Sequence, residues 1–138
     1  MSGIGYYRTQ IELPKEWENI DGVLLSVEST NSNTAAVYVN DQKADAFDIN
    51  TGIVDIGVLL KPGVNTILVE VSSTLNNRLL ARDYFEKGIE LSMELCAAAN
   101  NGFRPTRQTH CFILNPTVQD YGMTGRVSLK PYLKARID

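Results

Sequence analysis

The segment Lys61–Ser72, with the sequence KPGVNTILVEVS, predicts a chain corner followed by a β-strand. Proline presets φ at the first corner position of a β-turn, and glycine supplies the positive φ that the next position needs. The residues Thr66–Ser72 are β-branched or apolar at alternate positions, which is typical of a strand with one buried face. We therefore expect this strand to lie at the centre of a sheet.

Further short strands are predicted on both sides of this segment. They are Tyr7–Leu13, Val23–Glu28, Ala35–Val39, Gln42–Phe47, Ile53–Ile56, His110–Leu114, and Arg126–Leu129 running on towards Tyr132. Pro14 ends the first of them, because proline has no N–H to give to a strand ladder. Asn40 and Asp41 tolerate left-handed backbone and predict a tight hairpin. Many short strands with turns every ~8–12 residues indicate a β-sandwich or barrel.

The segment Asn76–Ala99 departs from the strand pattern. Its apolar residues recur at helical spacing, with charged residues between them: Leu79, Leu80, Phe85, Ile89, Met93 and Cys96. Asn100-Asn101-Gly102 is a helix stop signal. We expect one amphipathic helix here, lying over one edge or end of the sandwich.

Size and charge narrow the classes of function. The chain has 138 residues, the usual size of one domain, and its net charge is −3. An acidic chain with scattered lysines and arginines argues against a nucleic-acid partner. No apolar run approaches the ~18 residues of a membrane helix, and Met1 is followed by no signal-peptide pattern. We expect no membrane partner, and the compartment stays open.

The chain offers little for metal binding or catalysis. Cys96 and Cys111 are too few for a disulfide framework, so they are either two free, mostly buried thiols or a pair across a loop. One histidine and no CxxC exclude a zinc site. That histidine, His110, falls in a predicted strand and is interpreted as structural. The sequence pairs no two of its 16 acidic residues as glycosidase carboxylates, so we predict no catalytic residue.

Seven short motifs follow one another in an order that is typical of one family. They are Gly3-x-Gly5-x-Tyr7; Leu13-Pro14-x-x-Trp17; Val37-Tyr38-Val39-Asn40; Val54-Asp55-Ile56 with Leu59-Leu60; Lys61-Pro62-Gly63-x-Asn65-Thr66-x-x-Val69-x-Val71; Thr74-Leu75-x-Asn77-Arg78-Leu79; and Tyr121-Gly122-x-x-Gly125-x-Val127-x-Leu129-x-Pro131-Tyr132. From Gly3 to Tyr132 the chain resembles the galactose-binding-like jelly-roll domain of family 2 glycoside hydrolases. The version attached to bacterial α-L-rhamnosidase-like enzymes is the most similar. Asp41 stands where the family usually has a hairpin glycine, which leaves the type of turn open.

The resemblance implies an all-β, galactose-binding-like jelly-roll β-sandwich with one inserted helix over residues 76–99. Residues 1–138 would form a single domain that is part of a larger glycoside hydrolase, with the catalytic acids on another domain. The implied function is that of a non-catalytic carbohydrate-binding module. Its partners would be carbohydrate and the catalytic domain of the parent chain. The alternative is a structural or interaction sandwich that braces the catalytic domain and binds no small ligand.

Sugar binding needs aromatic faces for C–H stacking and planar polar groups for hydroxyls. Predicted loops and turns offer six candidate binding residues: Trp17, Phe47, Asp48, Asn77, Arg78 and Tyr121. Trp17 could instead pack under the sandwich. Phe47 and Asp48 lie in an acidic loop with Asp45, which suits a sugar, a calcium ion or simple solvation. Arg78 could fork to vicinal hydroxyls, or pair structurally with an acid such as Asp55. No cofactor is expected besides calcium as an open option.

Overall fold

The computed structural model describes residues 2–99, 117–135 and 137. The chain divides into two compact units. One comprises Gly3–Ser73 with Tyr121–Asp138, and the other comprises Met1–Ser2 with Thr74–Asp120. The strands belong to the first unit and the α-helices to the second. None of the helices in the described part is long and apolar enough to cross a membrane.

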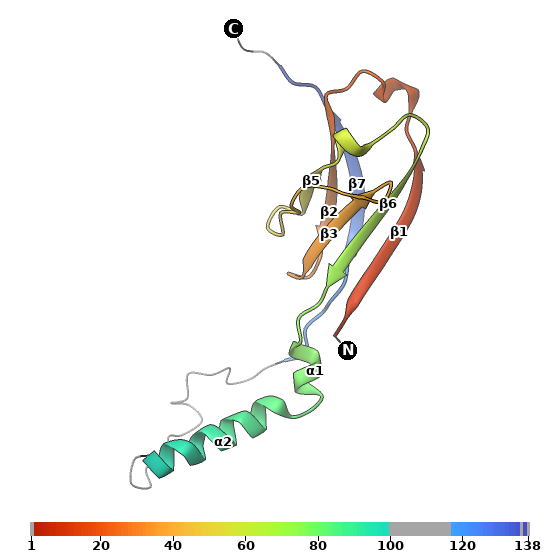
Figure 1. Cartoon of the computed structure of the whole chain (residues 1–138). Coiled ribbons are helices and arrows are strands. Elements are labelled where there is room, and N and C mark those ends of the chain that lie inside the picture. Colours follow the sequence, from red (N-terminus) through yellow and green to blue (C-terminus); the bar gives the residue numbers. More distant parts are fainter. Residues whose placement is uncertain (1, 100–116, 136, 138) are drawn as a thin grey trace. The chain divides into compact units, whose positions relative to one another are not determined.

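The first unit is a sandwich of two antiparallel sheets (Figure 1). One sheet has the order β1 (Ile4–Glu12), β6 (Val64–Ser72), β3 (Thr34–Val39) and β4 (Gln42–Lys43). The other has the order β5 (Ile53–Asp55), β2 (Gly22–Ser29) and β7 (Thr124–Tyr132). The predicted all-β sandwich is therefore confirmed. The strand that follows the Pro62-Gly63 corner lies between β1 and β3, as a central strand should.

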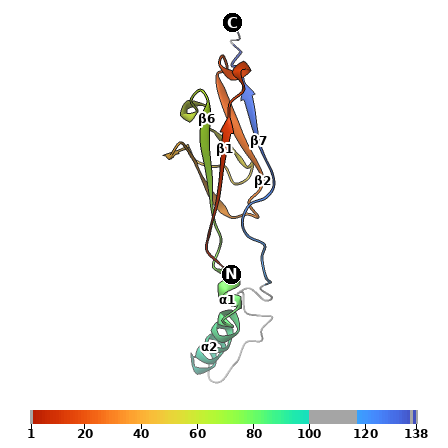
Figure 2. The same cartoon turned by 90° about the vertical axis from the view of Figure 1, so that its right-hand side faces the viewer.

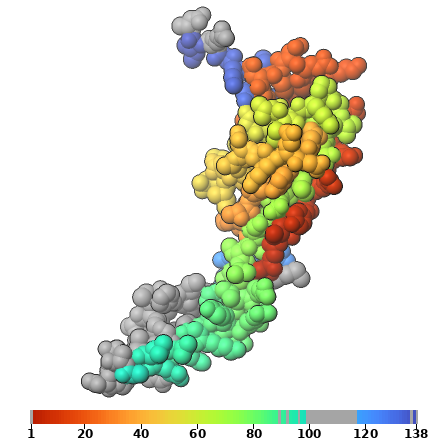
Figure 3. Space-filling model, in the orientation of Figure 1, coloured from red at the N-terminus to blue at the C-terminus, as the bar shows by residue number. Residues whose placement is uncertain are grey.

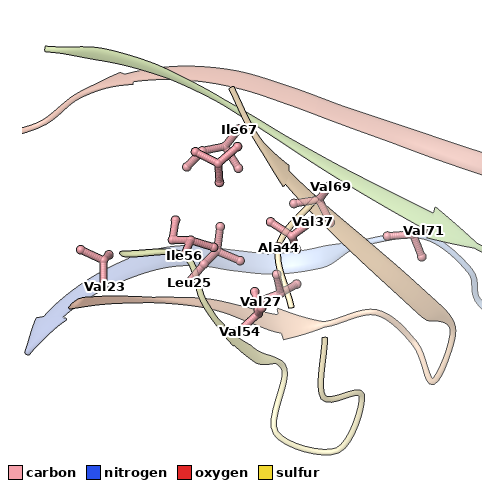
Figure 4. Packing of buried hydrophobic residues seen from close by; sticks show 11 residues of the cluster. Val23, Leu25, Val27, Val37, Ala44, Val54, Ile56, Ile67, Val69 and Val71 are labelled. Carbon is pink, nitrogen blue, oxygen red and sulfur yellow. The ribbon is translucent and has the colours of Figure 1, made fainter. Parts of the chain in front are cut away.

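The core lies between the two sheets and comes from alternate residues of their strands (Figure 4). The fully or nearly buried side chains are Val23, Leu25, Val27, Val37, Val39, Ala44, Val54, Ile56, Ile67, Val69 and Val71. Alternate residues supply this set, because successive side chains of a strand point to opposite faces: Val23, Leu25 and Val27 in β2, Val37 and Val39 in β3, and Ile67, Val69 and Val71 in β6. Each buried Val, Leu or Ile contributes about 1.5–3 kcal/mol of transfer free energy.

The hairpin after β3 is a two-residue turn, with Val39 paired to Gln42. Asn40 and Asp41 both have positive φ, 51° and 66°. This is the conformation of a type I′ turn, so Asp41 adopts the backbone that a hairpin glycine would. The turn that the sequence left open is therefore the same type that Asn-Gly favours. The Arg8 guanidinium lies 3.5 Å from the Asp41 carboxylate.

Two predicted elements differ in extent. The strand predicted over Gln42–Phe47 pairs only at Gln42 and Lys43. Ala44 is buried and its N–H donates to the Val37 carbonyl, after which the chain leaves the sheet. The strand predicted to reach Ile56 ends at Asp55, and a 3-10 helix, η2 (Gly57–Leu59), follows. The predicted strand His110–Leu114, Cys111 and the helix stop at 100–102 lie outside the described residues.

The helical segment predicted over 76–99 is present as two helices rather than one. They are α1 (Asn76–Leu80) and α2 (Tyr84–Ala99). The break falls at Asp83, whose φ of 52° cannot continue a right-handed helix. The Asp83 N–H turns back to the Leu80 carbonyl at 3.0 Å, while the Asp83 carbonyl accepts from Lys87 N at 3.1 Å and so opens α2. That these helices cover an edge of the sandwich stays a prediction.

Candidate functional site

A pocket of about 340 Å³ opens at one end of the sandwich. Residues from three segments line it: 12–18 after β1, 20–23 at the start of β2, and 57–63 between β5 and β6. Pro14 precedes a short 3-10 helix, η1 (Lys15–Trp17), whose Trp17 N–H donates to the Pro14 carbonyl at 3.0 Å. Figure 3 shows the orange-red first segment beside the yellow-green third segment at this end of the sandwich.

Trp17 is the only tryptophan of the chain, and it is half-buried in the wall of this pocket. One side of it packs against the hydrophobic core. The Trp17 indole N–H donates no hydrogen bond to another described residue. It is not buried either, because every buried side-chain nitrogen or oxygen among the described residues has a hydrogen-bond partner. Its N–H is therefore open to solvent. Both interpretations of Trp17 from the sequence, packing residue and binding residue, fit this position.

Charged side chains surround the mouth of the pocket. Three carboxylates, of Glu12, Glu18 and Asp21, and two ammonium groups, of Lys15 and Lys61, are exposed there. None of these five side chains forms an ion pair with another described residue. One oxygen of Asp21 accepts from the Lys134 N–H. The other charged groups of the rim remain available to a ligand.

Asn65 holds one wall of the pocket in place. Its side chain is fully buried at the start of β6. The amide oxygen accepts from Lys61 N at 2.9 Å, and the amide nitrogen donates to the carbonyls of Lys61 at 2.7 Å and Gly63 at 3.0 Å. Asn40 adds a bond of 2.8 Å to the same oxygen. The Pro62-Gly63 corner is therefore fixed from inside. Sequence analysis missed this role, although an asparagine entering an apolar strand is a usable signal.

Asp55 and Tyr132 hold Gly57 and Gly22 of the pocket lining in place. The Tyr132 hydroxyl donates to one carboxylate oxygen of Asp55, and the Gly57 N–H donates to the other at 2.9 Å. A Cβ on Gly57 would lie 2.7 Å from Gly22 Cα, and one on Gly22 would strike the Tyr132 ring. Only glycine at both positions allows this close approach. Asp55, which the sequence suggested as a partner for Arg78, is thus bound by Tyr132 and Gly57.

The pKa values of Asp55 and Tyr132 are both shifted from their ordinary values. Burial acts to raise the pKa of Asp55, but the hydrogen bonds from Tyr132 and from backbone N–H groups outweigh it, so this pKa lies below its ordinary value. The bond to Asp55 is the main cause of a raised pKa at Tyr132. Asp55 is therefore a carboxylate and Tyr132 a neutral phenol at neutral pH. Their bond is charge-assisted.

Phe47 and Asp48 stabilise their own loop. Phe47 is half-buried against the core. The Asp48 carboxylate accepts from the Thr51 hydroxyl at 2.8 Å and from Asn50 N at 2.9 Å. These two bonds, that of Thr51 first, hold the pKa of Asp48 below its ordinary value. Within the described ranges, no group of three or more His, Cys, Asp or Glu is placed to hold a metal ion.

The remaining candidates are not among the residues that line the pocket. Asn77, in α1, exchanges two bonds with the backbone of Gln119, of 2.7 and 2.8 Å, which engages both ends of its amide. Arg78 is exposed, and its backbone N–H donates to the Ser2 hydroxyl. Tyr121 is 47% exposed in the sandwich unit. Of the six predicted residues, Trp17 alone lines the pocket.

A second hollow of about 490 Å³ lies between β1 and β7, the outermost strands of the two sheets, on the side of the sandwich that Figure 2 presents. Its lining is mostly apolar, and the described residues place no acidic group in it: Tyr7, Arg8, Thr9, Ile11, Leu25, Ile67, Val69, Met123, Val127 and Leu129. The Tyr7 hydroxyl accepts from Met123 N at 3.0 Å and so joins the middle of β1 to the residue that precedes β7. This hollow suits apolar contact rather than hydroxyl recognition.

Neither a protein-family model nor a curated protein matches this sequence. Among solved structures, the rhamnosidase from Novosphingobium sp. PP1Y is similar over 93% of this chain, with a TM-score of 0.59 and 18% identity. A β-glucuronidase from Ruminococcus gnavus in complex with D-glucuronic acid is 28% identical over 52% of this chain, with a TM-score of 0.43. This chain covers 11% of the rhamnosidase chain and 13% of the glucuronidase chain. In fold, the chain is thus similar to a small β-sandwich part of a glycoside hydrolase.

Proposed function

We propose that this chain is a non-catalytic carbohydrate-binding module of a glycoside hydrolase. The observation that carries the proposal is the pocket at the end of the sandwich, where the only tryptophan is half-buried in the wall beside carboxylates that form no ion pair with a described residue. Ligand sites typically combine apolar and aromatic walls with a few polar groups that fix orientation. A hydroxyl-rich ligand with apolar C–H faces matches that combination.

The parent protein is proposed to be a rhamnosidase-like bacterial hydrolase. The fold likeness to a rhamnosidase, and the small share of that chain which is covered, support a domain whose chemistry lies elsewhere in a longer polypeptide. In this proposal residues 1–138 act as one ancillary domain. The partners are then a carbohydrate and the catalytic domain of the same chain.

A glycan array and calorimetry with the whole chain test this function. We expect binding of rhamnose- or galactose-containing glycans, and a loss of at least tenfold in affinity for Trp17→Ala, because the aromatic contact is removed. The matched control is Tyr6→Ala, since Tyr6 is 65% exposed and does not line the pocket. No array signal and no heat at millimolar sugar would sink the carbohydrate-binding role.

The alternative function is a sandwich that braces a catalytic domain. The apolar hollow between β1 and β7 favours it, because an apolar concavity without acidic neighbours is typical of protein contact. Its test is a pull-down of the parent's catalytic domain by this chain, with Val127→Lys as the disrupting variant. Capture that survives Val127→Lys would contradict docking at this hollow.

A further inference from the structure

We infer that the Trp17 pocket takes a neutral pyranose at the end of a glycan, in preference to a uronic acid. This inference rests on the proposed function and adds the site and the class of sugar. Three properties of the pocket carry it: its size, its walls and its balance of charge.

The size of the pocket suits a chain end. A volume of about 340 Å³ is at the lower end of the ~300–1,000 Å³ that is usual for small-ligand sites. That room admits about one or two sugar rings, and a polysaccharide lying across the surface would leave most of its rings outside.

The walls of the pocket suit the apolar face of a sugar ring. Trp17, Ile20 and Leu60 are half-buried in its lining, and the rings of Pro14 and Pro62 stand at its edge. A pyranose presents C–H groups on its faces, which pack on aromatic and aliphatic surfaces. The Trp17 ring supplies a large contact area, and its free N–H supplies a donor beside it.

The rim supplies both kinds of hydrogen-bonding group. A sugar hydroxyl is a donor and an acceptor at once. The carboxylates of Glu12 and Glu18 accept, while the ammonium groups of Lys15 and Lys61 donate, and none of the four is held in an ion pair within the described part of the chain. Hydrogen bonds to charged groups are stronger than those between two neutral groups.

The balance of charge disfavours an acidic sugar. The lining has three carboxylates against two ammonium groups, and it contains no arginine or histidine. A uronate would bring a fourth carboxylate to this rim without the guanidinium fork that pairs such a group bidentately. A neutral ring meets no such repulsion. The pocket is therefore selective by charge.

The walls are also held before any ligand arrives. Asn65 fixes Lys61 and Gly63 through backbone bonds, and Asp55 fixes Gly57. A preorganised site spends less of its binding free energy on ordering. A small sugar can therefore bind without first ordering these walls.

The single tryptophan makes the experiment specific for this pocket. The whole chain is labelled with ¹⁵N and titrated with methyl α-L-rhamnoside, methyl β-D-galactoside, D-glucuronate and D-galacturonate, while the indole N–H signal of Trp17 and the heat of binding are followed. We expect at least one neutral glycoside to shift the indole signal, with each uronate bound at least tenfold more weakly. Glu18→Gln should weaken the neutral sugar severalfold. It should also reduce the ratio of the affinity for the neutral sugar to the affinity for the uronates. Because Glu18 is exposed, we expect this variant to keep the fold.

Each outcome bears on a different claim. Equal or tighter binding of a uronate overturns the class of sugar. Heat without any shift of the Trp17 signal, and without an effect of Glu18→Gln, overturns the pocket but leaves a carbohydrate-binding module. No heat and no shift with any of the four sugars, together with a blank glycan array, overturns the pocket and the proposed function together.

Discussion

Asn65 shows how one buried polar side chain can shape a binding wall. It is fully buried, and four hydrogen bonds engage its amide. A buried donor or acceptor that loses its partner costs about 1–3 kcal/mol. The corner that this side chain fixes contains Lys61 and Gly63 of the pocket, so fold stability and binding share this residue.

Asn65→Ala is therefore expected to lower the free energy of unfolding by about 1–3 kcal/mol, because the backbone groups at Lys61 and Gly63 lose their partner. It should also weaken sugar binding, since the corner is released. Urea denaturation followed by Trp17 fluorescence measures the first effect. Gln10→Ala is the control, because this exposed strand residue should change stability by less than about 0.5 kcal/mol. An Asn65→Ala protein as stable as the control would show that the amide network is dispensable.

Because of the Asp55–Tyr132 bond, we expect the free energy of unfolding to decline at both acidic and alkaline pH. The pKa of Asp55 is depressed from 3.8, so its contribution is present above that pH and is lost as the pH falls through the folded value. The pKa of Tyr132 is raised from 10.0, so its contribution is present below that pH and is lost as the pH rises through the folded value. At neutral pH both Asp55 and Tyr132 therefore contribute to the free energy of unfolding.

Tyr132→Phe should remove the alkaline decline in stability and reduce the acidic one, because the phenol is lost and Asp55 keeps only backbone donors. Urea midpoints measured from about pH 3 to pH 11 test this expectation. Tyr6→Phe serves as the control, since Tyr6 is exposed. An unchanged alkaline decline in Tyr132→Phe would assign that decline to another tyrosine or lysine.

At the scale of elements, the β3–β4 hairpin holds a non-glycine residue in left-handed backbone. Asp41 has a φ of 66°. Left-handed conformation costs an ordinary L-residue about 1–2 kcal/mol, and Asp less because its short side chain bonds locally. The Arg8–Asp41 pair offsets little of this strain, because its side chains are 63% and 88% exposed and such pairs contribute about 0–1 kcal/mol.

Asp41→Gly is expected to raise the free energy of unfolding by about 0.5 kcal/mol, since glycine adopts this turn without steric strain and loses only the weak ion pair. Asp41→Ala is the matched variant. It loses the same ion pair but keeps a Cβ, and it should be destabilised by about 1 kcal/mol. Thermal denaturation of the three proteins checks the order Gly, Asp, Ala. If the Asp41 protein were the most stable of the three, the ion pair would outweigh the backbone strain.

Most of the fold could be predicted from the alternation of apolar and polar residues in the strands. The features that depend on tertiary contacts could not. Alternating apolar residues and the Pro62-Gly63 corner predicted the β-sandwich and its central strand. The sequence pattern around Ala44 did not show that the chain leaves the sheet after this buried residue. Nor did the helical pattern show the break at Asp83, because helical spacing continues on both sides of that residue.

The candidate site was less accessible from the sequence. Trp17 was found because a lone tryptophan after a proline is conspicuous, but its neighbours Glu12, Glu18 and Asp21 were not. They meet at the pocket only because the end of β1, the start of β2 and the chain before β6 lie at the same end of the sandwich. Phe47, Asp48 and Asn77 carry suitable chemical groups, but the groups are used within their own local structure.

For the whole molecule, burial is unevenly distributed between the two units. Every buried core residue lies in the sandwich unit, whereas no side chain described within Thr74–Ala99 is buried. Resistance to local opening follows the number of buried apolar contacts. The two units should therefore differ in stability.

Native-state hydrogen exchange is expected to show this difference. The amides of β2, β3 and β6 should exchange slowest, near the rate of global unfolding, and those of α2 should exchange much faster. Mass spectrometry of peptides from the whole chain measures both, with the strand peptides as the internal reference. Equal protection of α2 and β6 would contradict two units of unequal stability.

β1 and β7 are nine-residue strands, each with only one neighbouring strand in the described part of the chain. Each therefore presents a row of backbone groups that could template strand addition by another molecule, the first step towards fibrils. Arg126 and Lys130 on β7, Pro131 beside them and Arg8 on β1 obstruct that addition, because charge and proline disfavour edge-to-edge pairing. The charged side chains and the proline on these strands thus disfavour aggregation through these two edges.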